Sequence, residues 1–181
     1  MEMIKMKILV LGLGNLLLAD EGVGVHAAHS LLEDGCPDHV EVMDIGTAVL
    51  DALPALEEAE RVVVIDAVKG GHPPGTIYRM PIEAFESAKC IPSMHGFDIT
   101  RVLSLTQRNT PPEVTVLGVE PATIDWSLEL SPQVRATFPD LMRTLRDEIG
   151  EGGRFKDHRS SGRGVHPSRA LSPCGKSYGR G

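Results

Sequence analysis

Apolar residues fall into two patterns along this chain. Some stand in short continuous runs of Val, Ile and Leu, a pattern typical of strands buried on both faces of a sheet. Others recur at helical spacing along one side of a longer segment. The predicted strands are 7–13, 40–45, 61–67 and 113–119, and the predicted helices are 22–32, 47–57, 97–106 and 131–149. Because strands and helices alternate, the sequence predicts an α/β fold with a mainly parallel sheet between layers of helices.

Proline and small polar residues refine these boundaries. Thr47 is expected to cap the second helix, and Pro54 is expected to kink or restart it. Ser131 followed by Pro132 favours a helix start, since proline lacks an N–H that would go unbonded in the first turn. The segment 76–80 alternates between apolar and polar residues after a turn rich in glycine and proline. We expect it to form an antiparallel edge strand.

Acidic residues follow several of the predicted strands. Asp20 and Glu21 come after the first strand, and Asp44 lies near the end of the second. Asp66 lies near the end of the third, and Glu120 follows the last. Ligands of open α/β sheets bind beyond the carboxyl ends of the strands. These carboxylates are therefore expected to gather at the edge of the sheet where a site would lie.

The turn after the first strand, Gly12–Asn15, partly matches the glycine fingerprint of dinucleotide-binding folds. The third glycine position holds Leu17, and Asp20 and Glu21 would repel a pyrophosphate at the following helix. Asp44 does resemble an acid that binds a ribose. A dinucleotide-binding enzyme is thus the weaker alternative. Taken alone, Asp20 and Glu21 are explained by a favourable interaction with the helix dipole.

Together with His95, which precedes a predicted helix, Glu21 and Asp66 could supply two oxygens and one nitrogen to a divalent ion. Such a set suits nickel or zinc and leaves coordination positions open. Each residue alone is explained as well by a local hydrogen bond, so the hypothesis rests on the combination. The sequence contains neither H-E-x-x-H nor G-x-S-x-G, so neither a thermolysin-type site nor a serine elbow is indicated.

Composition narrows the class of protein. The 181 residues are 41% hydrophobic, which suits one domain, expected at 1–150. No run of about 18 apolar residues is present, so no membrane span is expected. The three cysteines show no C-x-x-C spacing, which favours a reducing cytoplasm over a disulfide or zinc framework.

Charge divides the chain into two parts. Residues 1–150 carry 11 basic and 23 acidic side chains, a balance that disfavours nucleic acid as a partner. Residues 151–181 carry seven basic and two acidic side chains and are rich in Gly, Ser and Arg. That segment cannot bury enough apolar surface to offset the entropy of ordering, so we expect a disordered tail.

Four stretches of the sequence form a recognisable set: GLGNLLLADEGVGVHAA, VIDAV, SMHGFD and TVLGVEP. In this order, over about 7–149, they resemble the [NiFe] hydrogenase maturation proteases. It implies a three-layer αβα sandwich and an endopeptidase that removes a short C-terminal extension from the nickel-loaded precursor of a hydrogenase large subunit. The family commonly has D-G-G-T-A after the second strand, where this chain has Ile45 in place of the first glycine.

Carried over to this chain, the resemblance implies that Glu21, Asp66 and His95 contact nickel and form the catalytic site. The nickel comes with the precursor and is not a resident cofactor, although other divalent ions can substitute in the free enzyme. Some classifications of such enzymes as aspartic-type rest on residues like Asp66. The resemblance also implies a monomer whose partner is the precursor. The alternative on the same fold is a chaperone that binds nickel or precursor without cleaving the chain.

Overall fold

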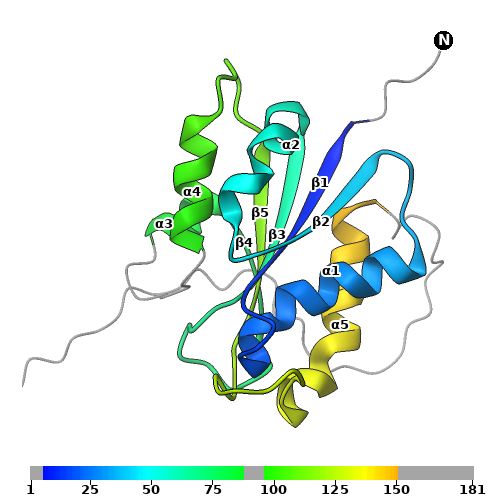
Figure 1. Cartoon of the computed structure of the whole chain (residues 1–181), viewed down its shortest axis with the longest axis vertical. Coiled ribbons are helices and arrows are strands. Elements are labelled where there is room, and N and C mark those ends of the chain that lie inside the picture. Colours follow the sequence, from blue (N-terminus) through cyan, green and yellow to red (C-terminus); the bar gives the residue numbers. More distant parts are fainter. Residues whose placement is uncertain (1–5, 88–95, 151–181) are drawn as a thin grey trace, which may run out of the picture.

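The structure, a computed structural model, describes residues 6–87 and 96–150. Five strands form one sheet in the order β2-β1-β3-β5-β4 (Figure 1). The four parallel strands are β1 (Ile8–Leu13), β2 (Val40–Gly46), β3 (Arg61–Ala67) and β5 (Glu113–Val119). The edge strand β4 (Ile77–Pro81) pairs antiparallel with β5. The predicted sheet type and its antiparallel edge are confirmed.

Helices cover both faces of the sheet, so the fold is the three-layer sandwich that the sequence predicts (Figure 1). One layer holds α1 (Val23–Asp34) and α5 (Pro132–Glu148), and the other holds α2 (Leu53–Glu58), α3 (Ile82–Ser87) and α4 (Gly96–Leu105). Alternate strand residues divide between the layers because strand side chains point to opposite faces. Val10 and Val63 belong to the core under α1 and α5, whereas Leu11, Val62 and Val64 belong to the core under the other layer.

Two of the three predicted features of the helix starts are present in the structure, and the third is not. The side-chain oxygen of Ser131 accepts the N–H of Val134, so the predicted cap of α5 is confirmed. Pro54 lies in the first turn of α2, directly after the 3₁₀ turn η2 (Val49–Ala52), as expected for a restarted helix. The prediction that Thr47 caps this region is wrong. The chain turns at Gly46 (φ 54°), and the residue before η2 is Ala48, which makes no side-chain cap.

One helix and one turn were not predicted. α3 has six residues and the 3₁₀ turn η1 (Ala19–Gly22) has four, both too short to show a hydrophobic period. The predicted tail at 151–181 lies outside the described residues. Within residues 6–87 and 96–150, no helix is long and apolar enough to cross a membrane.

The backbone of α1 packs directly onto the sheet. A Cβ atom added to Gly24 would lie 2.2 Å from the carbonyl oxygen of Ile65 and 2.3 Å from that of Leu13. A Cβ atom added to Gly12 would lie 2.4 Å from the carbonyl oxygen of Gly24. No side chain fits between these backbones, so glycine is required at both positions. The start of α1 is thereby fixed against the carboxyl ends of β1 and β3.

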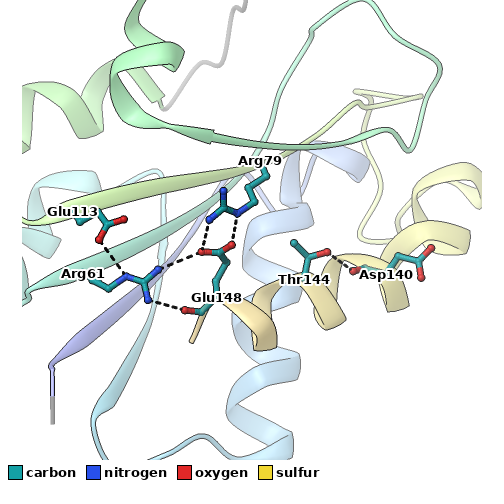
Figure 2. A network of polar contacts seen from close by, with 6 residues as sticks. All are labelled: Arg61, Arg79, Glu113, Asp140, Thr144 and Glu148. Carbon is teal, nitrogen blue, oxygen red and sulfur yellow. Dashed lines mark hydrogen bonds and ion pairs between the residues drawn. The ribbon is translucent and has the colours of Figure 1, made fainter. Parts of the chain in front are cut away.

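The end of α5 is held to the sheet by the carboxylate of Glu148 (Figure 2). This largely buried group contacts the guanidinium groups of Arg61 on β3 and Arg79 on β4. Arg61 also donates to the main-chain oxygen of Glu148, with 3.2 Å between donor and acceptor. The hydrogen bond to Glu148 raises the pKa of Arg79 above its usual value. One carboxylate therefore joins a helix to two separate strands.

Replacing Gly24 by alanine tests the backbone contact of α1. Intrinsic helix propensity would favour alanine by about 1 kcal/mol, but the contacts at 2.2 and 2.3 Å force the helix away from the strands. We expect Gly24→Ala to lower the free energy of unfolding by about 3 kcal/mol in chemical denaturation. The exposed control on the same helix, Glu33→Ala, should change it by less than about 0.5 kcal/mol. Equal stability of the two variants would contradict the packing described.

Replacing Glu148 by alanine tests the junction in Figure 2. The variant leaves two guanidinium groups without their shared acceptor, and we expect a loss of about 2 kcal/mol in the free energy of unfolding. Glu113→Ala is the matched control, since Oε2 of Glu113 lies 3.7 Å from Nε of Arg61 and the Glu113 side chain is mostly exposed. It should cost less than about 0.5 kcal/mol. Thermal or urea unfolding of both variants would measure the difference.

Candidate functional site

Four carboxylates are buried where the parallel strands end, as the sequence predicts. Asp20 and Glu21 lie in η1 after β1, Asp66 is the second-last residue of β3, and Glu120 follows β5; their exposed fractions are 0%, 4%, 1% and 7%. The strand order places β2 and β3 on opposite sides of β1. The edge between β1 and β3 is therefore the topological switch point, where ligands of such sheets bind.

Asp20 accepts hydrogen bonds from the backbone of a loop that is distant in the sequence. Its Oδ2 accepts the N–H groups of Ala122 and Thr123 at 2.8 and 2.9 Å, and its Oδ1 accepts the N–H of Ser131 at 2.7 Å. These three bonds come from the segment between β5 and α5. Because both oxygens accept backbone amides of a distant segment, Asp20 has a structural role and not merely the helix-dipole interaction considered from the sequence.

Glu120 accepts backbone hydrogen bonds from a second loop. Its Oε2 accepts the N–H of Gly70 at 2.7 Å and that of His72 at 3.3 Å, and the hydroxyl of Tyr78 also donates to it. Burial raises the pKa of Tyr78 well above its ordinary value, and the hydrogen bond to Glu120 adds to the effect. Glu120 thus fixes the loop between β3 and β4.

Glu21 and Asp66 remain as the candidate reactive carboxylates. A Cβ atom added to Gly14 (φ 124°) would lie 1.8 Å from the carbonyl oxygen of Glu21, so η1 folds back tightly on the end of β1. Asp66 lies on the neighbouring strand, and its Oδ1 accepts the N–H of Ala67 at 2.8 Å. Strand alternation places Asp66 on the face of Val64, which is the face that α4 covers. The two residues thus follow adjacent strands at the switch point.

The predicted third ligand, His95, lies outside the described residues. Within 6–87 and 96–150, no group of three His, Cys, Asp or Glu side chains is arranged to hold a metal ion. The expected set contains His95, so convergence of the three residues on one ion stays a prediction. The first described residue after it, Gly96, opens α4 on the face that carries Asp66.

Sequence reasoning missed a pair beside this edge. His29 on α1 and Asp44 on β2 form a surface contact, with 2.7 Å between Nε2 and Oδ2. The alternative role for Asp44 was ribose binding, and no spacing in the sequence connects it with His29. The glycines of the fingerprint are likewise explained within the chain. Gly12 and Gly14 allow backbone contacts with Gly24 and Glu21, so their presence does not require a pyrophosphate.

Comparison with known proteins places these residues in context. A family model described as hydrogenase maturation protease matches residues 25–148. The hydrogenase expression/formation protein HupD of Rhodobacter capsulatus is 38% identical over 151 residues, which cover 77% of this chain and 71% of the relative. The hydrogenase 2 maturation protease of Escherichia coli is 31% identical over 154 residues, covering 82% of this chain and 93% of the relative.

Solved structures show the same likeness. The hydrogenase maturating endopeptidase HybD from Escherichia coli superimposes with a TM-score of 0.72 at 30% identity, covering 82% of this chain and 94% of that one. The maturation protease HybD from Thermococcus kodakarensis gives a TM-score of 0.69 at 29% identity, with 80% and 99% covered. The likeness therefore extends over nearly the whole length of both solved chains.

The neighbouring acids Asp20 and Glu21 can be separated by isosteric amides. Asp20→Asn replaces one acceptor oxygen by an NH₂ group that faces a backbone N–H, and we expect it to lower the free energy of unfolding by about 2 kcal/mol. Hydrogen exchange of the amides of Ala122, Thr123 and Ser131 should accelerate. Glu21→Gln should cost less than about 1 kcal/mol and leave those amides protected. Similar losses in both variants would contradict the structural role given to Asp20.

Proposed function

The chain belongs to the family of hydrogenase maturation proteases, and from this premise we propose that it removes the C-terminal extension of a nickel-loaded [NiFe] hydrogenase large-subunit precursor. It is a peptidase, since its relatives are maturation proteases and endopeptidases. The observation that carries the rest is the pair Glu21 and Asp66. Both are buried at the switch point, where Glu21 lies just after β1 and Asp66 lies near the end of the adjacent parallel strand β3.

Nickel enters this reaction as part of the substrate. We propose that Glu21, Asp66 and His95 complete the coordination of the nickel that the precursor carries. Two carboxylates and an imidazole fit a divalent ion of this kind and leave positions for the ligands of the precursor. The placement of Asp66 on the α4 face supports this set, because α4 begins directly after His95. Only a metal-loaded precursor would then bind productively, which ties cleavage to a finished assembly step.

Hydrolysis adds water across the scissile peptide bond and releases a new carboxylate and a new amine. Within the proposed complex, the nickel carried by the precursor would polarise the scissile carbonyl or lower the pKa of the attacking water. Glu21 or Asp66 accepts the proton of that water as general base. In either assignment the carboxylates must be fixed beside the metal, and the close backbone contacts of Gly14 and Gly24 keep their strand ends in place.

We further propose that the enzyme acts as a monomer in the cytoplasm. The cysteine pattern supports this location: the chain has three cysteines without C-x-x-C spacing, and Cys36 is a free thiol. Hydrogenase precursors that have just received their nickel would meet the enzyme there.

A precursor cleavage assay tests the proposal. Nickel-loaded precursor should be shortened at its C-terminus, as read by mass spectrometry, and nickel-free precursor should stay intact. Glu21→Gln, Asp66→Asn and His95→Ala should each lower the rate by about 100-fold or more. His29→Ala, which removes a surface contact on the adjacent helix, should cleave at the native rate.

One outcome would overturn the proposed site, and another would overturn the proposed function. Normal processing by all three site variants would show that the site lies elsewhere. Binding of nickel-loaded precursor by the native chain without any shortening would identify a chaperone on the same fold.

A further inference from the structure

Four apolar side chains stand exposed beside the candidate site. Leu17, Ile124, Trp126 and Leu128 are 49%, 40%, 78% and 60% exposed, and Trp126 is the single tryptophan of the chain. We call these four residues the Trp126 surface. Single exposed apolar residues are ordinary, but a group that includes a nearly bare indole ring is typical of interaction sites.

The segments that carry these residues are joined by backbone hydrogen bonds. The N–H of Ser127 donates to the carbonyl of Leu17, with 3.0 Å between nitrogen and oxygen, and the N–H of Ala19 donates to the carbonyl of Ser127 at 2.8 Å. The N–H of Asp20 donates to the carbonyl of Thr123 at 3.2 Å. The segment after β1 and the segment before α5 therefore form one continuous surface although more than 100 residues separate them.

The loop that carries Trp126 is fixed as well as exposed. The buried carboxylate of Asp20 accepts three of the amides that flank it, those of Ala122, Thr123 and Ser131. The N–H of Trp126 donates to Oδ1 of Asp125 at 2.7 Å. A rigid loop loses little entropy when it binds, so an exposed aromatic ring on such a loop is a favourable anchor for a protein partner.

The Trp126 surface adjoins the proposed site and not another part of the molecule. Leu17 shortly precedes η1, which carries Glu21, and Asp20, which holds the loop, is the immediate neighbour of Glu21. Of the other exposed leucines, Leu32 near the end of α1 and Leu105 at the end of α4 lie toward the amino ends of the strands, and Leu50 lies in η2 after β2. A protein that delivers a peptide to Glu21 and Asp66 would meet the Trp126 surface first.

From these observations we infer that the Trp126 surface is the docking surface for the folded body of the large-subunit precursor, which presents to it an apolar patch edged by basic side chains. The inference rests on the proposed function. Charge favours this occupant over a second copy of the chain. The full chain has a net charge of −7, so two copies repel each other on balance, whereas a basic rim on the precursor is attracted to residues 1–150, which carry 23 acidic against 11 basic side chains. Asp125 is an exposed acid on the same loop, and the nearby Glu129 forms an ion pair with Arg135.

Docking through this surface lowers the KM for the precursor without changing the chemistry of cleavage. The test is the initial rate of cleavage of nickel-loaded precursor at a series of concentrations. Trp126→Ala and Leu128→Ser should each raise KM by about tenfold, the loss expected when an interface anchor is truncated. Their kcat values should stay within about twofold of native, since neither residue touches the scissile bond. Leu105→Ser is the matched control for Leu128→Ser, with 55% against 60% exposure, and should keep the native KM.

The single tryptophan gives a direct second measurement. Protein labelled with 5-fluorotryptophan should show one ¹⁹F signal, which should shift or broaden when unlabelled precursor is added. Glu21→Gln protein labelled in the same way should show the same change at saturating precursor, because the docking surface is intact in that variant.

The outcomes separate the two proposals. If the native enzyme does not shorten the precursor, the proposed function fails. If it does, and Trp126→Ala and Leu128→Ser keep the native KM or lose only kcat, the docking inference fails while the function stands. Sedimentation that shows a dimer of the native chain and a monomer of Trp126→Ala, with KM unchanged, would assign the surface to self-association and overturn the inference.

Discussion

The backbone of α1 touches the backbone of two strands, and this contact sets the position of everything at the carboxyl edge of the sheet. Gly24 packs against the carbonyl oxygens of Leu13 and Ile65, and Gly12 packs against the carbonyl oxygen of Gly24. Residues 14–22 connect β1 to α1 and include the 3₁₀ turn η1, which folds back onto Gly14 and carries Asp20 and Glu21. The spacing of the glycines thus determines where the carboxylates can be.

The two consecutive acids in this turn have different roles. Both oxygens of Asp20 accept hydrogen bonds from backbone amides, so the segment between β5 and α5 is fixed beside η1. Glu21 lies at the switch point together with Asp66. Burial of several carboxylates at one edge is costly unless hydrogen bonds compensate it. Asp20, Asp66 and Glu120 all accept backbone amides of the chain itself, and we propose that Glu21 and Asp66 also bind a metal that the substrate brings.

The same arrangement connects recognition with cleavage. The loop held by Asp20 carries Trp126 and Leu128, whose apolar side chains are exposed, while its anchored end lies next to Glu21. A precursor seated on this surface would have its C-terminal segment directed to the switch point. Binding energy gained at some distance from the scissile bond would then serve to position that bond, as it does in many enzymes that act on large substrates.

The sequence by itself determined the α/β class, the four parallel strands, the antiparallel edge strand and the cap at Ser131, because these depend on local periodicity and on the chemistry of single residues. It also placed the acids at the correct strand ends, since the rule for parallel sheets needs only the order of elements. It did not give the distinct roles of Asp20 and Glu21, the pairing of His29 with Asp44, or the surface formed by Leu17 and Trp126. Those depend on residues far apart in the chain, whose proximity exists only after the helices have packed on the sheet. The wrong prediction for Thr47 has a local cause, because the chain turns at Gly46 and η2 begins only after Ala48, so Thr47 is not the capping residue.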